Sequence, residues 1–192
     1  MNKKNKTTEE IFALAVQNQK KNNLQVAEKF YRETLKTNPN HIDAHNNLGI
    51  ILLRSGNLQK AIGCFEKVIE INPNHASAHN NFGVVFRQLG ENQKAISSYE
   101  KAIEIQPNHE SAHNNLGEVF RQLGELQKAK RCHQKAIEIN PNNASAHNNL
   151  GEVFRQLKEH QKAISCCKKA IQINSNHAKA YNNLGAVFKE LK

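Results

Sequence analysis

The chain has 192 residues, of which 6% are aromatic and none is tryptophan, and its mean hydropathy is −0.71. So polar a sequence does not predict one deep core, and many small local interfaces would suit it better. The 27 Lys and Arg residues exceed the 17 Asp and Glu residues, giving a formal net charge of +10. This excess is spread over both halves of the chain, so we interpret it as a solvated surface.

The N-terminal residues are basic, but they do not form a secretory signal. The apolar run that follows extends only from Ile11 to Val16, and Glu9 and Glu10 precede it. That run is too short and too acidic for a signal peptide, and no stretch approaches the length of a membrane span. We therefore expect a disordered basic tail over residues 1–7 and a cytoplasmic protein.

A five-residue motif, His-Asn-Asn-Leu-Gly, organises the rest of the chain. It begins at His45 and recurs at 34-residue steps without insertion or deletion, with Phe for Leu in the second copy and Tyr for His in the last. A fixed period of this kind is typical of a repeat array. The expected repeats are 8–41, which is degenerate, 42–75, 76–109, 110–143 and 144–177, with a half repeat at 178–192.

Each repeat is expected to hold two helices. In the second repeat the first helix is predicted over 43–54, and Gly56 follows it; the equivalents Gly90 and Gly124 suit a left-handed helix stop. The second helix ends before a proline, and all four prolines of the chain occupy this place. An apolar stripe is predicted at His79, Phe82, Phe86 and Leu89 of the third repeat and at their equivalents.

Small residues predict how the two helices meet. Gly49 and its equivalents lie inside the first helix, where Gly costs about 1 kcal/mol, so a close approach of the second helix is expected there. Phe65 and Tyr99 would fill this contact from the second helix. His133 and Cys167 replace them in later repeats, where weaker packing is expected.

The Leu-Gly pair, the Ala twelve residues after that Gly, the aromatic residue four further on and the terminal Pro resemble the tetratricopeptide repeat. The resemblance covers residues 8–192. It implies an all-α fold, a right-handed superhelical solenoid of antiparallel helix hairpins, with five repeats and a terminal single helix. It also implies a concave groove, lined by the first helices, that binds a protein or peptide partner.

Two asparagines stand together in five successive first helices, although Asn is a poor helix former. An amide offers one acceptor and two donors, which can match a peptide group of any sequence. First helices about 8–10 Å apart would place one Asn at every third residue of an extended peptide. The motif is most similar to the asparagine-ladder units of O-GlcNAc transferase. The first Asn row comprises Asn46, Asn80, Asn114, Asn148 and Asn182, and the second Asn row, which fits the ladder best, comprises Asn47, Asn81, Asn115, Asn149 and Asn183.

Charged residues flank these rows on the face expected to point outward. Arg87, Arg121 and Arg155 share one repeat place, and Glu118 and Glu152 share another. They would recognise charged side chains of a partner, or else pair with one another. The Lys and Asn clamp by which chaperone-binding members hold a C-terminal carboxylate is missing. Copying of the Asn rows by duplication without use is the other interpretation of those rows.

Two further features invite chemical interpretations. Pairs such as His41 and His45 have the i, i+4 spacing of metal ligands, but the repeat itself supplies both places and no Cys or carboxylate recurs with them. Cys64, Cys132 and Cys166 share one repeat place and lie too far apart to form a disulfide. We expect no metal, no cofactor, buried or half-buried thiols and no enzymatic activity.

The sequence is also compatible with other functions. The basic charge and helical repeats would also suit an RNA-binding array, although the period of 34 residues and the lack of groove aromatics oppose it. The last predicted helix keeps an interior apolar pattern that nothing in the sequence covers, formed by Tyr181, Leu184, Phe188 and Leu191. Either this surface self-associates, or the chain is the substrate-recruiting N-terminal module of a larger, transferase-like protein.

Overall fold

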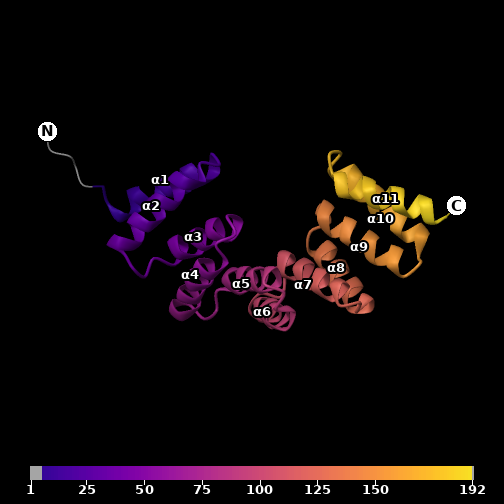
Figure 1. The fold of residues 1–192 in the computed structure, drawn as a ribbon, viewed down its shortest axis with the longest axis horizontal. Helices are drawn as coiled ribbons and strands as arrows, with labels where there is room; N and C mark the ends of the chain where they lie inside the picture. Colours follow the sequence, from indigo (N-terminus) through magenta and orange to yellow (C-terminus); the bar gives the residue numbers. More distant parts are fainter. Residues whose placement is uncertain (1–5, 192) are drawn as a thin grey trace. The chain divides into compact units, whose positions relative to one another are not determined.

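The computed structural model describes residues 6–191, which form eleven α-helices and no strand (Figure 1). The predicted all-α array of helix hairpins is therefore confirmed. The chain forms two compact units, residues 1–89 and 90–192. The first unit contains α1 (Thr8–Lys20), α2 (Leu24–Thr37), α3 (Ile42–Arg54), α4 (Leu58–Ile71) and α5 (Ala76–Gln88). The second contains α6 (Asn92–Ile105), α7 (Glu110–Gln122), α8 (Leu126–Ile139), α9 (Ala144–Gln156), α10 (His160–Ile173) and α11 (Ala178–Glu190).

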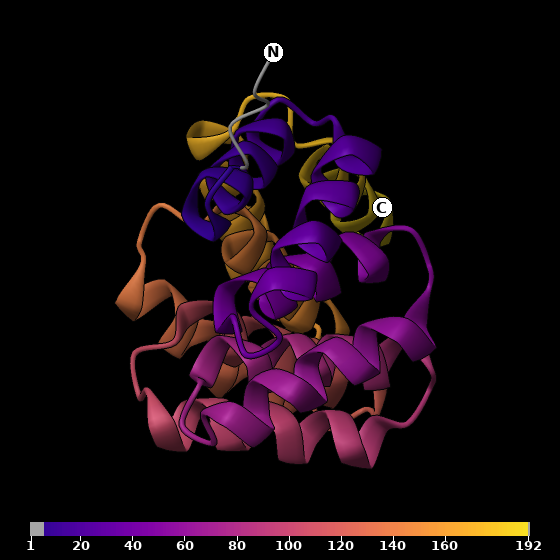
Figure 2. The same cartoon turned by 90° about the vertical axis from the view of Figure 1, so that its left-hand side faces the viewer.

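Hairpins pack in the order of the sequence within each unit. The pairs α1/α2 and α3/α4 are hairpins of the first unit, and α7/α8 and α9/α10 are hairpins of the second. Figure 2 shows α1 and α2, in indigo, as such a pair. Each second helix also packs on the next first helix within its unit, and successive first helices contact each other in the pairs α3/α5, α7/α9 and α9/α11.

The turn inside each repeat requires a left-handed residue. Gly56, Gly90 and Gly124 have φ of +76°, +76° and +78°, as the sequence predicted. The same place holds Asn22 with φ +61° and Lys158 with φ +62°. A residue with a Cβ is strained in this conformation, more so for Lys than for Asn.

Histidines, which the sequence analysis did not assign to this role, cap the first helices. The Nδ1 atoms of His41, His75, His109 and His177 accept a hydrogen bond from the backbone N–H three residues on, at 3.1–3.3 Å. Asn143 makes the equivalent contact through its side-chain oxygen at 3.0 Å. These acceptors satisfy one of the free N–H groups that every helix N-terminus exposes.

Close contact at the regularly spaced glycines follows the prediction. A Cβ at Gly49 would lie 2.6 Å from Phe65 Cε1, and one at Gly117 would lie 2.8 Å from His133 Cε1. His133 and Phe65 are both fully buried. The second helix therefore rests directly on the glycine backbone. The weaker packing expected at His133 is not seen, because His133 is fully buried and approaches Gly117 almost as closely as Phe65 approaches Gly49.

The buried stripe of the first helix differs from the predicted one. Leu89, predicted on the stripe, is 43% exposed, whereas Val85 and Ala78, which the stripe left out, are fully buried. The stripe was predicted from a single contact, the one between the two helices of the same hairpin. Each first helix also packs on the second helix of the preceding repeat, and this second contact buries residues beside the stripe.

Candidate peptide-binding face

Hydrogen bonds join the two Asn rows from one repeat to the next. In the second unit, Nδ2 of Asn149 donates to Oδ1 of Asn114 at 3.3 Å, and Nδ2 of Asn183 donates to Oδ1 of Asn148 at 3.0 Å. In the first unit, Nδ2 of Asn81 donates to Oδ1 of Asn46 at 3.2 Å. The second Asn row thus binds the first Asn row of the preceding repeat, which the sequence analysis did not predict.

The two rows differ in exposure. Asn80 and Asn148 of the first Asn row are buried, with exposed fractions of 7% and 4%, so the outward position predicted for that row is wrong at these residues. They lie between neighbouring first helices, where the inter-repeat bonds form. Asn182, on α11, is exposed. All five members of the second Asn row are half-buried: Asn47, Asn81, Asn115, Asn149 and Asn183.

A buried histidine extends this network in the second unit. The Nδ1 of His133 on α8 donates to Oδ1 of Asn114 on α7 at 2.9 Å. Burial lowers the pKa of His133 to about 4, so the ring is neutral. Its Nε2 is buried without a hydrogen-bond partner among the described residues. The Oδ1 of Asn114 therefore accepts both from its own hairpin and from Asn149 of the next repeat.

The predicted charged residues pair with one another where both are present. Nε and Nη2 of Arg121 donate to Oε2 and Oε1 of Glu118 at 2.9 and 2.7 Å. The same two atoms of Arg155 donate to Oε2 and Oε1 of Glu152. Arg155 also forms an ion pair with Glu190 on α11.

These pairs keep both carboxylates charged. Burial raises the pKa of Glu118, but the hydrogen bonds and charge of Arg121 outweigh it and hold the pKa below its usual range. The same balance lowers the pKa of Glu152 beside Arg155. Because each planar guanidinium already holds a carboxylate through two parallel bonds, these side chains present ion pairs rather than single charges to a partner.

The histidine pairs have structural partners. His45 Nε2 contacts the backbone oxygen of Pro39 at 2.8 Å, while Nδ1 of His41 accepts the capping bond. Equivalent contacts recur at His79, His113 and His147. Over residues 6–191, no group of three or more His, Cys, Asp or Glu side chains is placed to hold a metal ion.

The cysteines are free thiols. Cys64, Cys132 and Cys166 are half-buried and Cys167 is buried. Burial raises the pKa of each thiol to about 11. Because the thiolate is the reactive form, these groups are poor nucleophiles at neutral pH.

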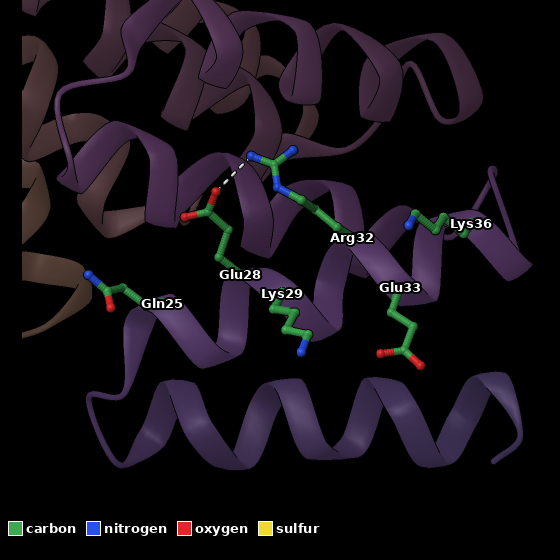
Figure 3. A pocket seen from close by; sticks show the side chains of 6 residues that line it. All are labelled: Gln25, Glu28, Lys29, Arg32, Glu33 and Lys36. Carbon is green, nitrogen blue, oxygen red and sulfur yellow. Dashed lines mark hydrogen bonds and ion pairs between the residues drawn. The ribbon is translucent and has the colours of Figure 1, made fainter. Parts of the chain in front are cut away.

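A hollow on α2 in the first unit is charged and open. It has a volume of about 530 Å³ and is lined only by polar and charged side chains (Figure 3). The ion pair between Glu28 and Arg32, at 2.7 Å, crosses it. Such long, mostly exposed side chains are typical of a solvated helix surface. The lining residues are Gln25, Glu28, Lys29, Arg32, Glu33 and Lys36.

The described helices include no candidate for a membrane-spanning segment. None of those in residues 6–191 is long and apolar enough to cross a bilayer.

The fold and the glycine contacts define a helical-hairpin repeat protein with a 34-residue period. Models of the tetratricopeptide repeat match residues 40–108, 74–142 and 144–177. The chain therefore belongs to the tetratricopeptide repeat family, whose repeats serve as protein-interaction scaffolds.

Solved structures agree with this fold. MamA aligns with a TM-score of 0.69 at 25% identity, over 90% of this chain and 94% of that one. TTC0263, a thermophilic TPR protein in Thermus thermophilus, aligns with a TM-score of 0.79 at 18% identity, over 95% and 100% of the two chains. YrrB, a TPR protein with an unusual peptide-binding site, aligns with a TM-score of 0.66 at 22% identity, over 92% and 91%. No curated protein matches the chain.

Proposed function

We propose that this chain is a protein-interaction scaffold that binds an extended peptide along the second Asn row. The observation that carries the proposal is the bond from each of Asn81, Asn149 and Asn183 to the preceding repeat. These bonds orient the half-buried amides before any ligand arrives. Preorganised groups lose less entropy on binding, so they suit ligand recognition better than mobile ones do.

Asn149 retains capacity for a ligand. Nδ2 of Asn149 carries two hydrogens and gives one to Asn114, and its Oδ1 accepts only a long contact, 3.3 Å, from Asn148. One donor hydrogen and one acceptor lone pair of Asn149 therefore have no partner among residues 6–191. A peptide group offers the complementary pair, a C=O and an N–H. An amide in each repeat matches every third peptide unit of an extended chain, since that chain advances about 3.3 Å per residue.

The Arg–Glu pairs border this row. Glu118 lies about one helical turn after Asn115 on α7, and Arg121 about one turn after Glu118, so the carboxylate stands between the amide and the guanidinium around the helix. Since the ion pair is already satisfied internally, we propose that it shapes the rim of the groove and accepts polar side chains of the peptide. Sequence selectivity would then come from the rim, and affinity from the amides.

A peptide array probed with the full chain tests the proposal. The variant in which Asn149 and Asn183 are both changed to Ala should lose binding to most of the peptides that the wild-type chain selects. Asn182→Ala is the matched control, because Asn182 is exposed on the same helix as Asn183. Unchanged binding by the double variant, with helix content preserved by circular dichroism, would refute the ladder.

The stability of each variant must be measured together with its peptide binding. Each lost Asn–Asn bond is expected to cost about 1 kcal/mol of unfolding free energy, because these bonds also join the repeats. Loss of stability without loss of peptide binding would assign the Asn rows to the scaffold alone.

A further inference from the structure

One arginine of the predicted binding face differs from its equivalents. Arg121 and Arg155 each hold the glutamate three residues earlier on the same helix through two hydrogen bonds. Arg87 has the same repeat place on α5, but Val84 lies three residues before it, and α5 contains no Asp or Glu. Arg87 therefore lacks the carboxylate that its two equivalents hold.

The guanidinium of Arg87 has no other partner in the part of the chain that the structure describes. Arg87 is half-buried, and its Nε is buried without a hydrogen bond. No carboxylate among residues 6–191 forms an ion pair with it. A buried donor without a partner costs free energy. Turning this guanidinium toward a ligand breaks no hydrogen bond with the protein, whereas Arg121 would have to give up two.

The neighbouring first helix supplies apolar side chains at the corresponding places. On α3, which contacts α5, Ile50 has the place of Val84 and Leu53 has the place of Arg87, and both are half-buried. The one acidic residue of α3 is Asp43, ten residues before Leu53 and hence about 15 Å away along the helix axis. The first unit therefore presents an unpaired cation beside apolar side chains, where water screens a charge less than in bulk solvent.

Helical spacing relates this arginine to the Asn rows. Asn80, Val84 and Arg87 have the i, i+4, i+7 spacing that places side chains on one face of a helix. Asn81, which follows Asn80, bonds to Asn46 of α3. Seven residues of helix rise about 10 Å, a distance that the long side chains of Arg87 and of a ligand glutamate can bridge together.

We infer that Arg87 binds the carboxylate of an acidic side chain in the bound peptide. That carboxylate takes the role that Glu118 and Glu152 have for their own arginines, and two parallel N–H···O bonds to the planar guanidinium recognise it. The inference rests on the proposed peptide binding and names its ligand class, an extended peptide with Glu or Asp at the residue that passes α5. The ion pairs of the second unit are satisfied internally, so they do not select such a charge.

A substitution scan of a peptide selected on the array tests the inference. The peptide is made with an amidated C-terminus, so that side chains supply its carboxylates, and each residue in turn is replaced by Glu and by Gln. The full wild-type chain should bind the Glu form about tenfold more tightly than the Gln form at one position. Because the interaction is ionic, this gap should shrink at about 0.5 M salt.

Matched variants of the chain locate the site. Arg87→Gln should remove the gap and still bind the Gln form with wild-type affinity. Val84→Glu should do the same, because the introduced carboxylate pairs with Arg87 as Glu118 pairs with Arg121. Arg54→Gln removes the same charge from an exposed place on α3 and should keep the gap.

The availability of Arg87 can also be measured without a peptide. In the wild-type background, Val84→Glu should not lower the midpoint of urea unfolding, because the new carboxylate gains a partner. In the Arg87→Gln background, the same change should lower the midpoint, since the carboxylate then lies unpaired beside apolar side chains. Equal shifts in the two backgrounds would show that Arg87 does not accept a carboxylate there and would overturn the inference.

The remaining outcomes separate this inference from the peptide-binding proposal. Equal affinity of the Glu and Gln forms at every position, a gap that survives Arg87→Gln, or a gap that Arg54→Gln removes would overturn the inference alone. If the double variant of Asn149 and Asn183 binds as tightly as wild type while the Glu preference depends on Arg87, the ladder fails and the carboxylate site stands. A wild-type chain that selects no peptide would overturn both.

Discussion

Acid should destabilise the second unit through His133, and replacing this residue by Phe should remove that loss. His133 has an ordinary pKa of 6.5 when the chain is unfolded and a pKa of about 4 in the folded unit, where burial disfavours the charged ring. Between these values the unfolded state binds more protons, so stability is complete above pH 6.5 and falls as the pH is lowered. Two titrations with these pKa values give a loss of about 2 kcal/mol between pH 8 and pH 5.

Urea unfolding followed by circular dichroism at pH 8, 6.5 and 5 measures the effect. His133→Phe should be within about 1 kcal/mol of the wild-type chain at pH 8, because the lost bond to Asn114 is offset by removal of a buried unpaired Nε2. It should then decline less by about 2 kcal/mol on acidification. The reciprocal variant, Phe65→His in the first unit, should acquire a new acid-dependent loss. Parallel pH profiles for His133→Phe and wild type would refute the assignment of this loss to the buried ring.

Three further outcomes are expected. Gly49→Ala should cost about 1–2 kcal/mol of unfolding free energy in urea, because its Cβ would lie 2.6 Å from Phe65. Gly185→Ala should be neutral or stabilising by up to about 1 kcal/mol, because its Cβ would meet no atom within 4 Å. Equal effects of the two changes would disprove the close-contact explanation. Lys158→Gly should raise the thermal midpoint, with a gain of about 1 kcal/mol, by relieving φ of +62°; a lower midpoint would contradict the strain. Cys167, with a pKa of about 11, should react with iodoacetamide at pH 7.5 far more slowly than a free cysteine in urea-unfolded chain, and equal rates would show that burial does not protect it.

The fold was predictable because its signals are local and repeated. The glycine turns, the prolines and the Gly49 contact with Phe65 each depend on residues within one repeat, and all appear where the 34-residue period places them. The buried stripe was predicted less well. The stripe was predicted from the contact between the two helices of one hairpin, whereas Val85 is buried by the second helix of the preceding repeat.

The candidate site was harder to predict because its contacts cross between repeats. A single repeat shows two adjacent amides, but not that Asn149 bonds to Asn114, 35 residues earlier. The capping histidines could have been found from their place immediately before each first helix. Glu118 and Arg121 have i, i+3 spacing. This spacing predicts an ion pair within the helix as strongly as it predicts recognition of charged side chains on a partner protein.

Backbone recognition by the second Asn row is the central claim, and a scan of backbone N-methylation tests it most directly. A peptide selected on the array is resynthesised with one N-methyl group at each successive residue, and its affinity for the full chain is measured by calorimetry. Loss of affinity by about tenfold should recur at every third residue, because each amide of the row contacts one peptide unit per repeat. Affinity that is insensitive to N-methylation, but is lost when peptide side chains are changed to Ala, would contradict the account.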